Sequence, residues 1–72
     1  MASQGRAQVI GTGLIGGSIG MALRARGWHV TGRDADEARA ARALELGALD
    51  AVGSDDAADV TFVATPVSAV AG

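Results

Sequence analysis

The 72-residue chain contains no cysteine. Disulfide bridges, a thiolate nucleophile and cysteine-based zinc sites are therefore excluded. Aromatic residues are scarce, with one Trp, one Phe and no Tyr, and there is a single Pro. No apolar run is long enough to cross a membrane, and the first residues lack the apolar segment of a secretory signal. We therefore expect a cytoplasmic protein without a membrane partner.

Charge of one sign does not dominate the chain. Six basic residues, all of them Arg, stand against eight Asp and Glu, which gives a formal net charge of −2. No basic run points to nucleic acid as a partner. The stretch "DDAAD" at residues 55–59 has no further ligand at metal-binding spacing, so we interpret it as a solvated loop and predict no metal site. The length allows one small domain.

Hydrophobic periodicity predicts strands that alternate with helices. The expected elements are a strand at 6–11, a helix at 14–26, a strand at 28–32, a helix after Asp36 to 46, a weak strand at 48–52 and a strand at 60–64. In the second helix we expect the core to be faced by Ala38, Ala40, Ala41 and Leu44. This order, β-α-β-α-β-β, favours an α/β fold with an open parallel sheet that is covered on both faces.

Glycines are concentrated between the first strand and the first helix. Gly11, Gly13 and Gly16 match the pattern G-x-G-x-x-G. In this pattern the first glycine permits a tight turn, the second lets a pyrophosphate approach the backbone, and the third lets the helix pack on the strand. The helix start at Leu14 and Ile15 would direct unpaired amides and the positive end of the helix dipole at the phosphates. The segment therefore predicts a dinucleotide-binding turn.

An acidic residue follows the second predicted strand, where the pattern places a ribose ligand. Asp34 lies near the expected separation of about 20 residues from the glycines and can accept hydrogen bonds from the adenosine ribose. Its charge would repel a 2′-phosphate, so NAD is favoured over NADP. Arg33 beside it is the residue type of an NADP site. Because adjacent strand residues point to opposite sides, only one of the two should face the ribose, and the motif position favours Asp34.

Two further positions bear on the site. Thr65 and Pro66 follow the last strand, at the sheet edge where parallel sheets bind ligands, so their backbone is a candidate to line the cofactor. The alternative is that they simply end the strand. His29, the single His, lies at the start of the second strand and thus at the opposite end of the sheet, so we assign it no catalytic role.

Several segments together resemble the cofactor domain of prephenate and arogenate dehydrogenases. They are "GLIGGS" at 13–18, "GRD" at 32–34, "LELGALD" at 44–50 and "TPVSA" at 65–69. The resemblance implies the N-terminal part of a Rossmann-type doubly wound parallel sheet. Residues 1–72 are then expected to be the N-terminal portion of a dinucleotide-binding domain, with the remainder of that domain and a substrate and dimerisation domain outside this chain.

Enzymes of this family oxidise prephenate or arogenate with NAD or NADP and release carbon dioxide, on the route to tyrosine in aromatic amino acid biosynthesis. The resemblance implies that Gly11, Gly13 and Gly16 contact the pyrophosphate and that Asp34 contacts the ribose. Where the family often has an aromatic residue before this aspartate, the chain has Arg33. The family's catalytic His and Ser correspond to no position here, so no catalytic residue is assigned and the 72 residues alone are not expected to be active. A small-molecule substrate and a homodimer through the C-terminal region are implied for the intact protein.

Two other functions remain open at this point. A non-catalytic nucleotide-sensing module of the potassium-uptake type uses the same glycine turn and an acidic end of the second strand. Another hydroxyacid or imine dehydrogenase would share the cofactor site. The segment "TPVSA" and the single acidic residue after the second strand favour the prephenate-type enzyme over the sensor, since sensors more often have paired acids there.

Overall fold

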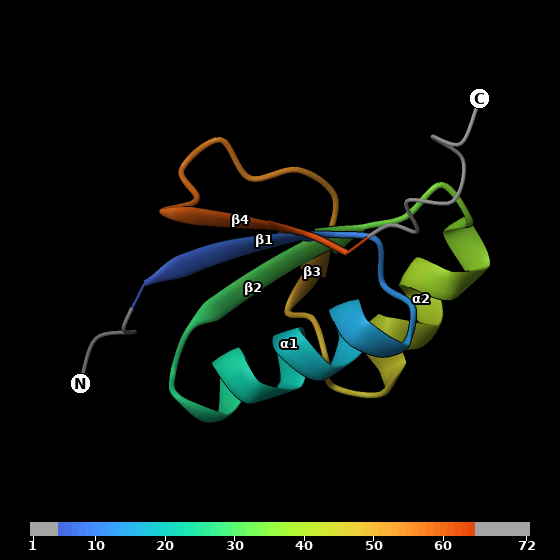
Figure 1. Cartoon of the computed structure of the whole chain (residues 1–72), viewed down its shortest axis with the longest axis horizontal. Helices are drawn as coiled ribbons and strands as arrows, with labels where there is room; N and C mark the ends of the chain where they lie inside the picture. Colours follow the sequence, from blue (N-terminus) through green and yellow to red (C-terminus); the bar gives the residue numbers. More distant parts are fainter. Residues whose placement is uncertain (1–4, 65–72) are drawn as a thin grey trace.

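The computed structural model describes residues 5–64 of the chain (Figure 1). Strands and helices follow in the predicted order: β1 (Arg6–Ile10), α1 (Leu14–Ala25), β2 (His29–Arg33), α2 (Glu37–Glu45), β3 (Ala51–Val52) and β4 (Val60–Val63). The α/β pattern is thus confirmed, with element ends shifted by a few residues. Thr65 and Pro66 lie outside the described residues.

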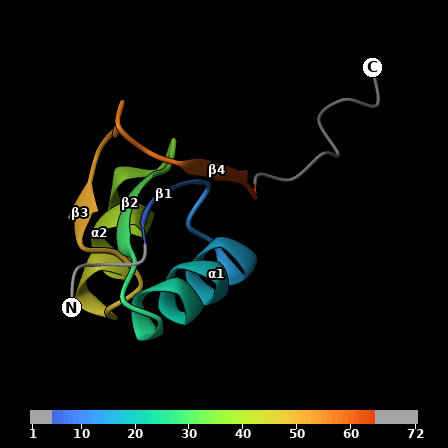
Figure 2. The same ribbon diagram turned by 90° about the vertical axis from the view of Figure 1, so that its left-hand side faces the viewer.

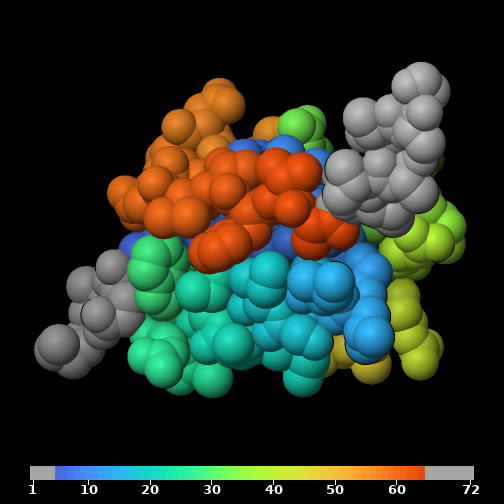
Figure 3. Space-filling view, viewed as in Figure 1, coloured from blue at the N-terminus to red at the C-terminus, as the bar shows by residue number. Residues whose placement is uncertain are grey.

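The four strands form one parallel sheet with the order β3-β2-β1-β4. β1 is central, since Val9 is paired with Gly32 of β2 on one side and with Phe62 of β4 on the other. β4 lies at an edge beside α1 in the space-filling view (Figure 3), and Val63 is 68% exposed there. Because the chain proceeds from β1 to one side and later returns to the other, the order reverses at β1, which is where open parallel sheets bind ligands.

Both helices lie on the same face of the sheet. α1 packs against β1 and β2, and α2 packs against β2 and β3 (Figures 1 and 2). This follows from two successive right-handed crossovers in one direction, from β1 to β2 and from β2 to β3. The core between these layers consists of buried Val9, Val30, Ala43, Ala48 and Leu49, with Ile19, Leu23 and Trp28 packed against them.

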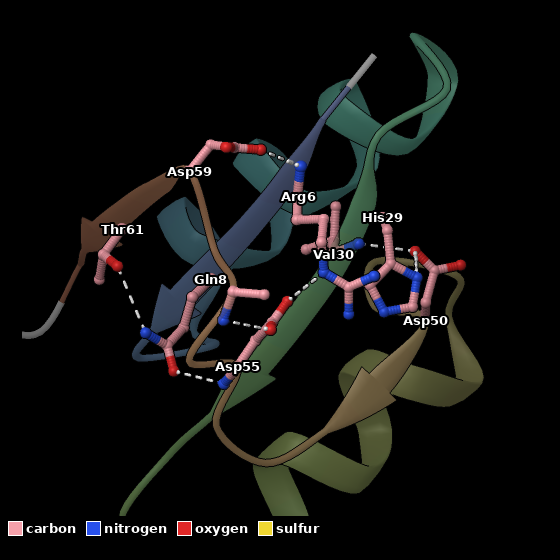
Figure 4. Close-up of polar contacts among 9 residues, drawn as sticks. Arg6, Gln8, His29, Val30, Asp50, Asp55, Asp59 and Thr61 are labelled. Carbon is pink, nitrogen blue, oxygen red and sulfur yellow. Dashed lines mark hydrogen bonds and ion pairs between the residues drawn. The ribbon is translucent and has the colours of Figure 1, made fainter. Parts of the chain in front are cut away.

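The opposite face of the sheet is not packed against either helix of residues 5–64, as in the first half of a doubly wound sheet. Within residues 5–64, that face is crossed by the connection between β3 and β4, which arches over the sheet in Figure 1. Asp55 holds the connection in place (Figure 4): its carboxylate accepts from Arg6 Nε at 2.9 Å, and its backbone amide donates to Gln8 Oε1 at 3.1 Å. The segment 55–59 is therefore a loop, as expected, but Asp55 is bound to β1 and its side chain is only 8% exposed.

The face of α2 that packs on the sheet also differs from the prediction. Ala40 and Ala43 are the buried residues of this helix, whereas Ala38 and Ala41 are exposed and Leu44 is 41% exposed. Of the four residues expected to face the core, only Ala40 is buried. The physical reason is that Leu49, from the connection after the helix, is one of the largest fully buried side chains. It fills the core beside β2, so α2 presents small side chains there.

The partly exposed carboxylate of Asp50 bonds to the start of β2, at the end of the sheet remote from the glycine-rich turn. Asp50 Oδ2 accepts from the Val30 amide at 2.7 Å, and Asp50 Oδ1 accepts from Arg24 Nε at 3.0 Å. His29 Nδ1 lies 4.0 Å from the same carboxylate (Figure 4). His29 is paired with Arg6 at the start of β1, which places it at the predicted end of the sheet.

No helix among the described residues is long and apolar enough to cross a membrane.

Substitution of Leu49 tests this account of the core. Leu49→Ala should lower the free energy of unfolding by about 2–5 kcal/mol, because the side chain is 2% exposed and its removal leaves a cavity over Gly32. Leu46→Ala is the matched control, since Leu46 is 59% exposed three residues earlier. Urea denaturation followed by circular dichroism measures both. Equal denaturation midpoints for the two variants would contradict the assignment of Leu49 to the core.

Candidate nucleotide-binding site

The glycine-rich turn lies at the edge of the sheet where the three longer strands end (Figure 1). The Gly11 amide donates to the Arg33 carbonyl at the end of β2, at 2.8 Å. On the other side, the Ala64 amide donates to the Ile10 carbonyl, also at 2.8 Å. The turn between β1 and α1 is thus held between the ends of β2 and β4, at the point where the strand order reverses.

The first and third glycines of the pattern are required by the protein itself. Gly11 has a φ of 92°, in the left-handed region that glycine adopts without a steric penalty. A Cβ atom on Gly16 would overlap the Gly11 carbonyl oxygen, so α1 can approach the turn only with glycine at this position. The predicted roles of Gly11 in the turn and of Gly16 in packing therefore agree with the geometry.

Gly13 differs from both of them. Its φ is −71°, which any residue can adopt, and a Cβ atom there would meet no heavy atom within 4 Å. Neither backbone strain nor contact with the described protein explains a glycine here. The space beside Gly13 is open at the start of α1, where the sequence pattern places a pyrophosphate.

Helix α1 begins at Leu14 with its amino end open. Gly13 is the N-cap residue and makes no side-chain cap, and no acidic residue occupies the first turn. The first helical bond is from the Gly17 amide to the Gly13 carbonyl, at 2.8 Å. The amides of the first turn, including those of Leu14 and Ile15, have no helical carbonyl to bind. Together with the helix dipole, they can bind an anion.

Asp34 turns towards the glycine-rich turn and is held by three donors. Its Oδ2 accepts from the Thr12 amide at 2.8 Å and from Thr12 Oγ1 at 3.1 Å. Its Oδ1 accepts from the Asp36 amide at 2.8 Å, and Arg39 Nη1 lies 4.0 Å away. The amides of Asp36 and Thr12 hold the pKa of the Asp34 carboxyl below its usual value, although burial opposes them. The carboxylate is therefore ionised near neutral pH and acts only as an acceptor.

Arg33 and Asp34 contact different parts of the molecule. Arg33 Nη1 donates to Ser54 Oγ at 3.2 Å, in the connection after β3. Asp34 instead contacts the turn after β1. This agrees with the expectation that the two side chains leave the strand in opposite directions. Of the two, Asp34 is the one beside the glycines.

Thr12 was not identified from the sequence. It occupies a variable position of the G-x-G pattern, and its hydroxyl group was the only available signal.

The predicted N-cap of α2 is present, since Asp36 Oδ1 accepts from the Ala38 and Arg39 amides at 3.0 and 3.3 Å. The first turn of α2 therefore brings Arg39 close to Asp34. A hollow of about 350 Å³ between the helices adjoins this region, lined by Thr12, Gly13, Leu14, Arg39 and Arg42 among others.

The strand order, the glycine turn at the reversal point and the acidic end of β2 are those of a Rossmann-type α/β domain. A sequence model of the prephenate dehydrogenase nucleotide-binding domain matches residues 19–72. The chain belongs to this family. The matched range begins after Gly16, so the evidence for the glycine turn is its geometry.

A solved structure supports the same family. The crystal structure of arogenate dehydrogenase from Synechocystis is similar, with a TM-score of 0.80 and 31% sequence identity over 88% of this chain. The match covers 24% of that protein, so the chain spans about a quarter of its length. A search of curated protein sequences gave no match.

The environment of Asp34 predicts a dependence of stability on pH. Its lowered pKa means that Asp34 stabilises the fold fully above the unfolded-state pKa of about 3.9 and progressively less below it. Asp34→Asn should lower the free energy of unfolding by about 1.5–3 kcal/mol at pH 7. This difference from the unsubstituted protein should become smaller below about pH 4. Urea denaturation between pH 3 and 7 measures this dependence.

Asp56→Asn serves as the control for this experiment. Asp56 is exposed and makes no hydrogen bond or ion pair with residues 5–64. The Asp56→Asn substitution should leave the free energy of unfolding nearly unchanged at every pH. A difference between Asp34→Asn and the unsubstituted protein that does not vary with pH would contradict a lowered pKa at Asp34.

Proposed function

We propose that this domain binds a nicotinamide dinucleotide, with NAD favoured over NADP, as the cofactor-binding part of a dehydrogenase. The unexplained glycine at position 13 is the observation that supports this proposal most directly. Its conformation suits any residue and a Cβ would meet no protein atom within 4 Å. A ligand against the backbone explains why glycine stands there.

The groups around this space suit a dinucleotide. The open amino end of α1 supplies backbone donors for the pyrophosphate without a basic side chain. Asp34 presents an ionised carboxylate beside the turn, which can accept from a ribose hydroxyl. The distance between these two features is short, because Thr12, the residue before Gly13, bonds directly to Asp34.

The preference for NAD follows from the sign of the charge at the end of β2. A 2′-phosphate placed against the Asp34 carboxylate would be repelled, and the side chain is 7% exposed and held by three donors. Arg33, which could have offset this repulsion, is bound to Ser54 in another part of the structure. Bound NAD would accept a hydride from the substrate, and this domain contributes its binding and orientation.

For the intact protein we propose the reaction of the family, an oxidative decarboxylation of prephenate or arogenate on the route to tyrosine. The family membership and the similarity to the Synechocystis enzyme support this proposal. We further propose that the substrate site and the homodimer contact are formed by regions outside residues 1–72, since the chain spans about a quarter of that enzyme. No catalytic residue is assigned within 5–64.

Calorimetric titration of the intact protein with NAD tests the cofactor site. Gly13→Val should weaken NAD binding at least about tenfold, because the branched side chain would occupy the space of the pyrophosphate and exclude it from the amides of α1. Its thermal unfolding temperature should fall by no more than the cost of Val at this N-cap position, since the added Cβ meets no heavy atom within 4 Å, and the variant should remain folded.

Gly17→Ala is the matched control for Gly13→Val. Gly17 lies four residues later, in the first turns of α1, and a Cβ there would only touch the Thr12 carbonyl at 4.0 Å. This variant should bind NAD as the unsubstituted protein does. Absence of NAD binding by the unsubstituted protein, or equal affinity in Gly13→Val, would overturn the cofactor assignment. NAD binding without turnover of prephenate or arogenate would favour the sensor or another hydroxyacid or imine dehydrogenase.

A further inference from the structure

One residue supplies two of the three hydrogen bonds that hold Asp34. The Thr12 amide and hydroxyl both donate to the same oxygen, Oδ2, at 2.8 and 3.1 Å. Thr12 is itself 6% exposed, so its side chain is fixed by its surroundings. The carboxylate cannot donate, so the hydroxyl must be the donor in this pair. Thr12 therefore orients Asp34 through a main-chain and a side-chain bond at once.

This arrangement limits what Asp34 can offer to a ligand. A carboxylate oxygen has about two lone pairs in its plane, and on Oδ2 both are used by Thr12. Oδ1 accepts one bond, from the Asp36 amide, and so retains one free acceptor position. The carboxylate can thus accept from one ribose hydroxyl through Oδ1, in an orientation set by the bonds on Oδ2.

Arg39 offers the carboxylate a competing position. Its Nη1 lies 4.0 Å from Asp34 Oδ1, beyond hydrogen-bond distance, and the Arg39 side chain is 55% exposed. Rotation of the carboxylate towards Arg39 would form a closer ion pair and would partly neutralise the charge that a ribose phosphate meets. The two bonds from Thr12 and the bond from the Asp36 amide oppose that rotation, and of the three only the Thr12 hydroxyl bond depends on a side chain.

We propose that Thr12 is a positioning residue that sets the cofactor preference of this domain, by holding the Asp34 carboxylate towards the ribose and away from Arg39. The inference rests on the proposed binding of a nicotinamide dinucleotide and adds a residue to it. The Thr12 side chain has no direct role towards the pyrophosphate in this account. Its effect on the ligand passes through Asp34.

Titration of the intact Thr12→Val variant with NAD and with NADP tests this inference. Val has nearly the shape of Thr and keeps the backbone amide, so only the hydroxyl bond to Asp34 is lost. We expect NAD affinity to fall about tenfold, because binding must then restore the Asp34 orientation that the hydroxyl bond no longer favours. NADP affinity should stay equal or rise, because the carboxylate, then held by two amides alone, can turn more easily towards Arg39. The dissociation constant of NADP divided by that of NAD should therefore fall about tenfold or more.

Thr12→Ser restores a hydroxyl at this position and should recover the preference of the unsubstituted protein. Thermal unfolding of both variants shows whether they are folded, and Thr12→Ala replaces Thr12→Val if the latter is not. A purely structural role of Thr12 would weaken NAD and NADP binding by the same factor. Equal weakening of both, or an unchanged ratio, would overturn the positioning role.

The same titrations separate failure of this inference from failure of the proposed function. If the unsubstituted protein binds NAD and Gly13→Val does not, the cofactor site stands, and an unchanged preference in Thr12→Val refutes only the role of Thr12. If the unsubstituted protein binds neither NAD nor NADP, the cofactor site is refuted and the role of Thr12 with it.

Discussion

The hydrogen bonds on the Asp34 carboxylate connect three segments that are separate in the sequence. Asp34 follows β2, Thr12 belongs to the turn after β1, and Asp36 caps α2. One ionised group thus adds to the backbone bond between Gly11 and Arg33 in fixing the glycine-rich turn against the end of the neighbouring strand. The amides of Thr12 and Asp36 stabilise the negative charge of the Asp34 carboxylate. This charge lies near the open space beside Gly13. The geometry of the candidate site depends on this group more than on any other.

The sheet explains why the turn can serve as a binding site. β1 has β2 on one side and β4 on the other, so the chain leaves an opening above its carboxyl end. Gly11 and Gly16 let α1 begin directly beneath this opening, because one permits the left-handed backbone and the other lets the helix lie against the Gly11 carbonyl. The family match and the similarity to the Synechocystis structure agree with this architecture.

Residues with strong local preferences made much of the fold predictable. The alternation of strands and helices, the glycine turn, the cap at Asp36 and the opposite directions of Arg33 and Asp34 all follow from short-range patterns, and each is present in the structure. The buried face of α2 was predicted wrongly, because the pattern of Ala and Leu does not show that Leu49, beyond the helix, fills the core. The contacts of the loop after β3 were not predicted, since Asp55 binds β1 and holds this loop across the second face of the sheet among residues 5–64.

The sequence alone determined the fold class, the position of the turn and the identity of the acidic residue beside it, because these depend on spacing along the chain and on the intrinsic properties of glycine and aspartate. Only the tertiary structure decided that Thr12 binds Asp34, that Arg39 lies close to it, and that Arg33 is bound elsewhere. These contacts join residues 5 to 22 positions apart. Their partners are chosen by the strand register and the packing of α2, which no local pattern specifies.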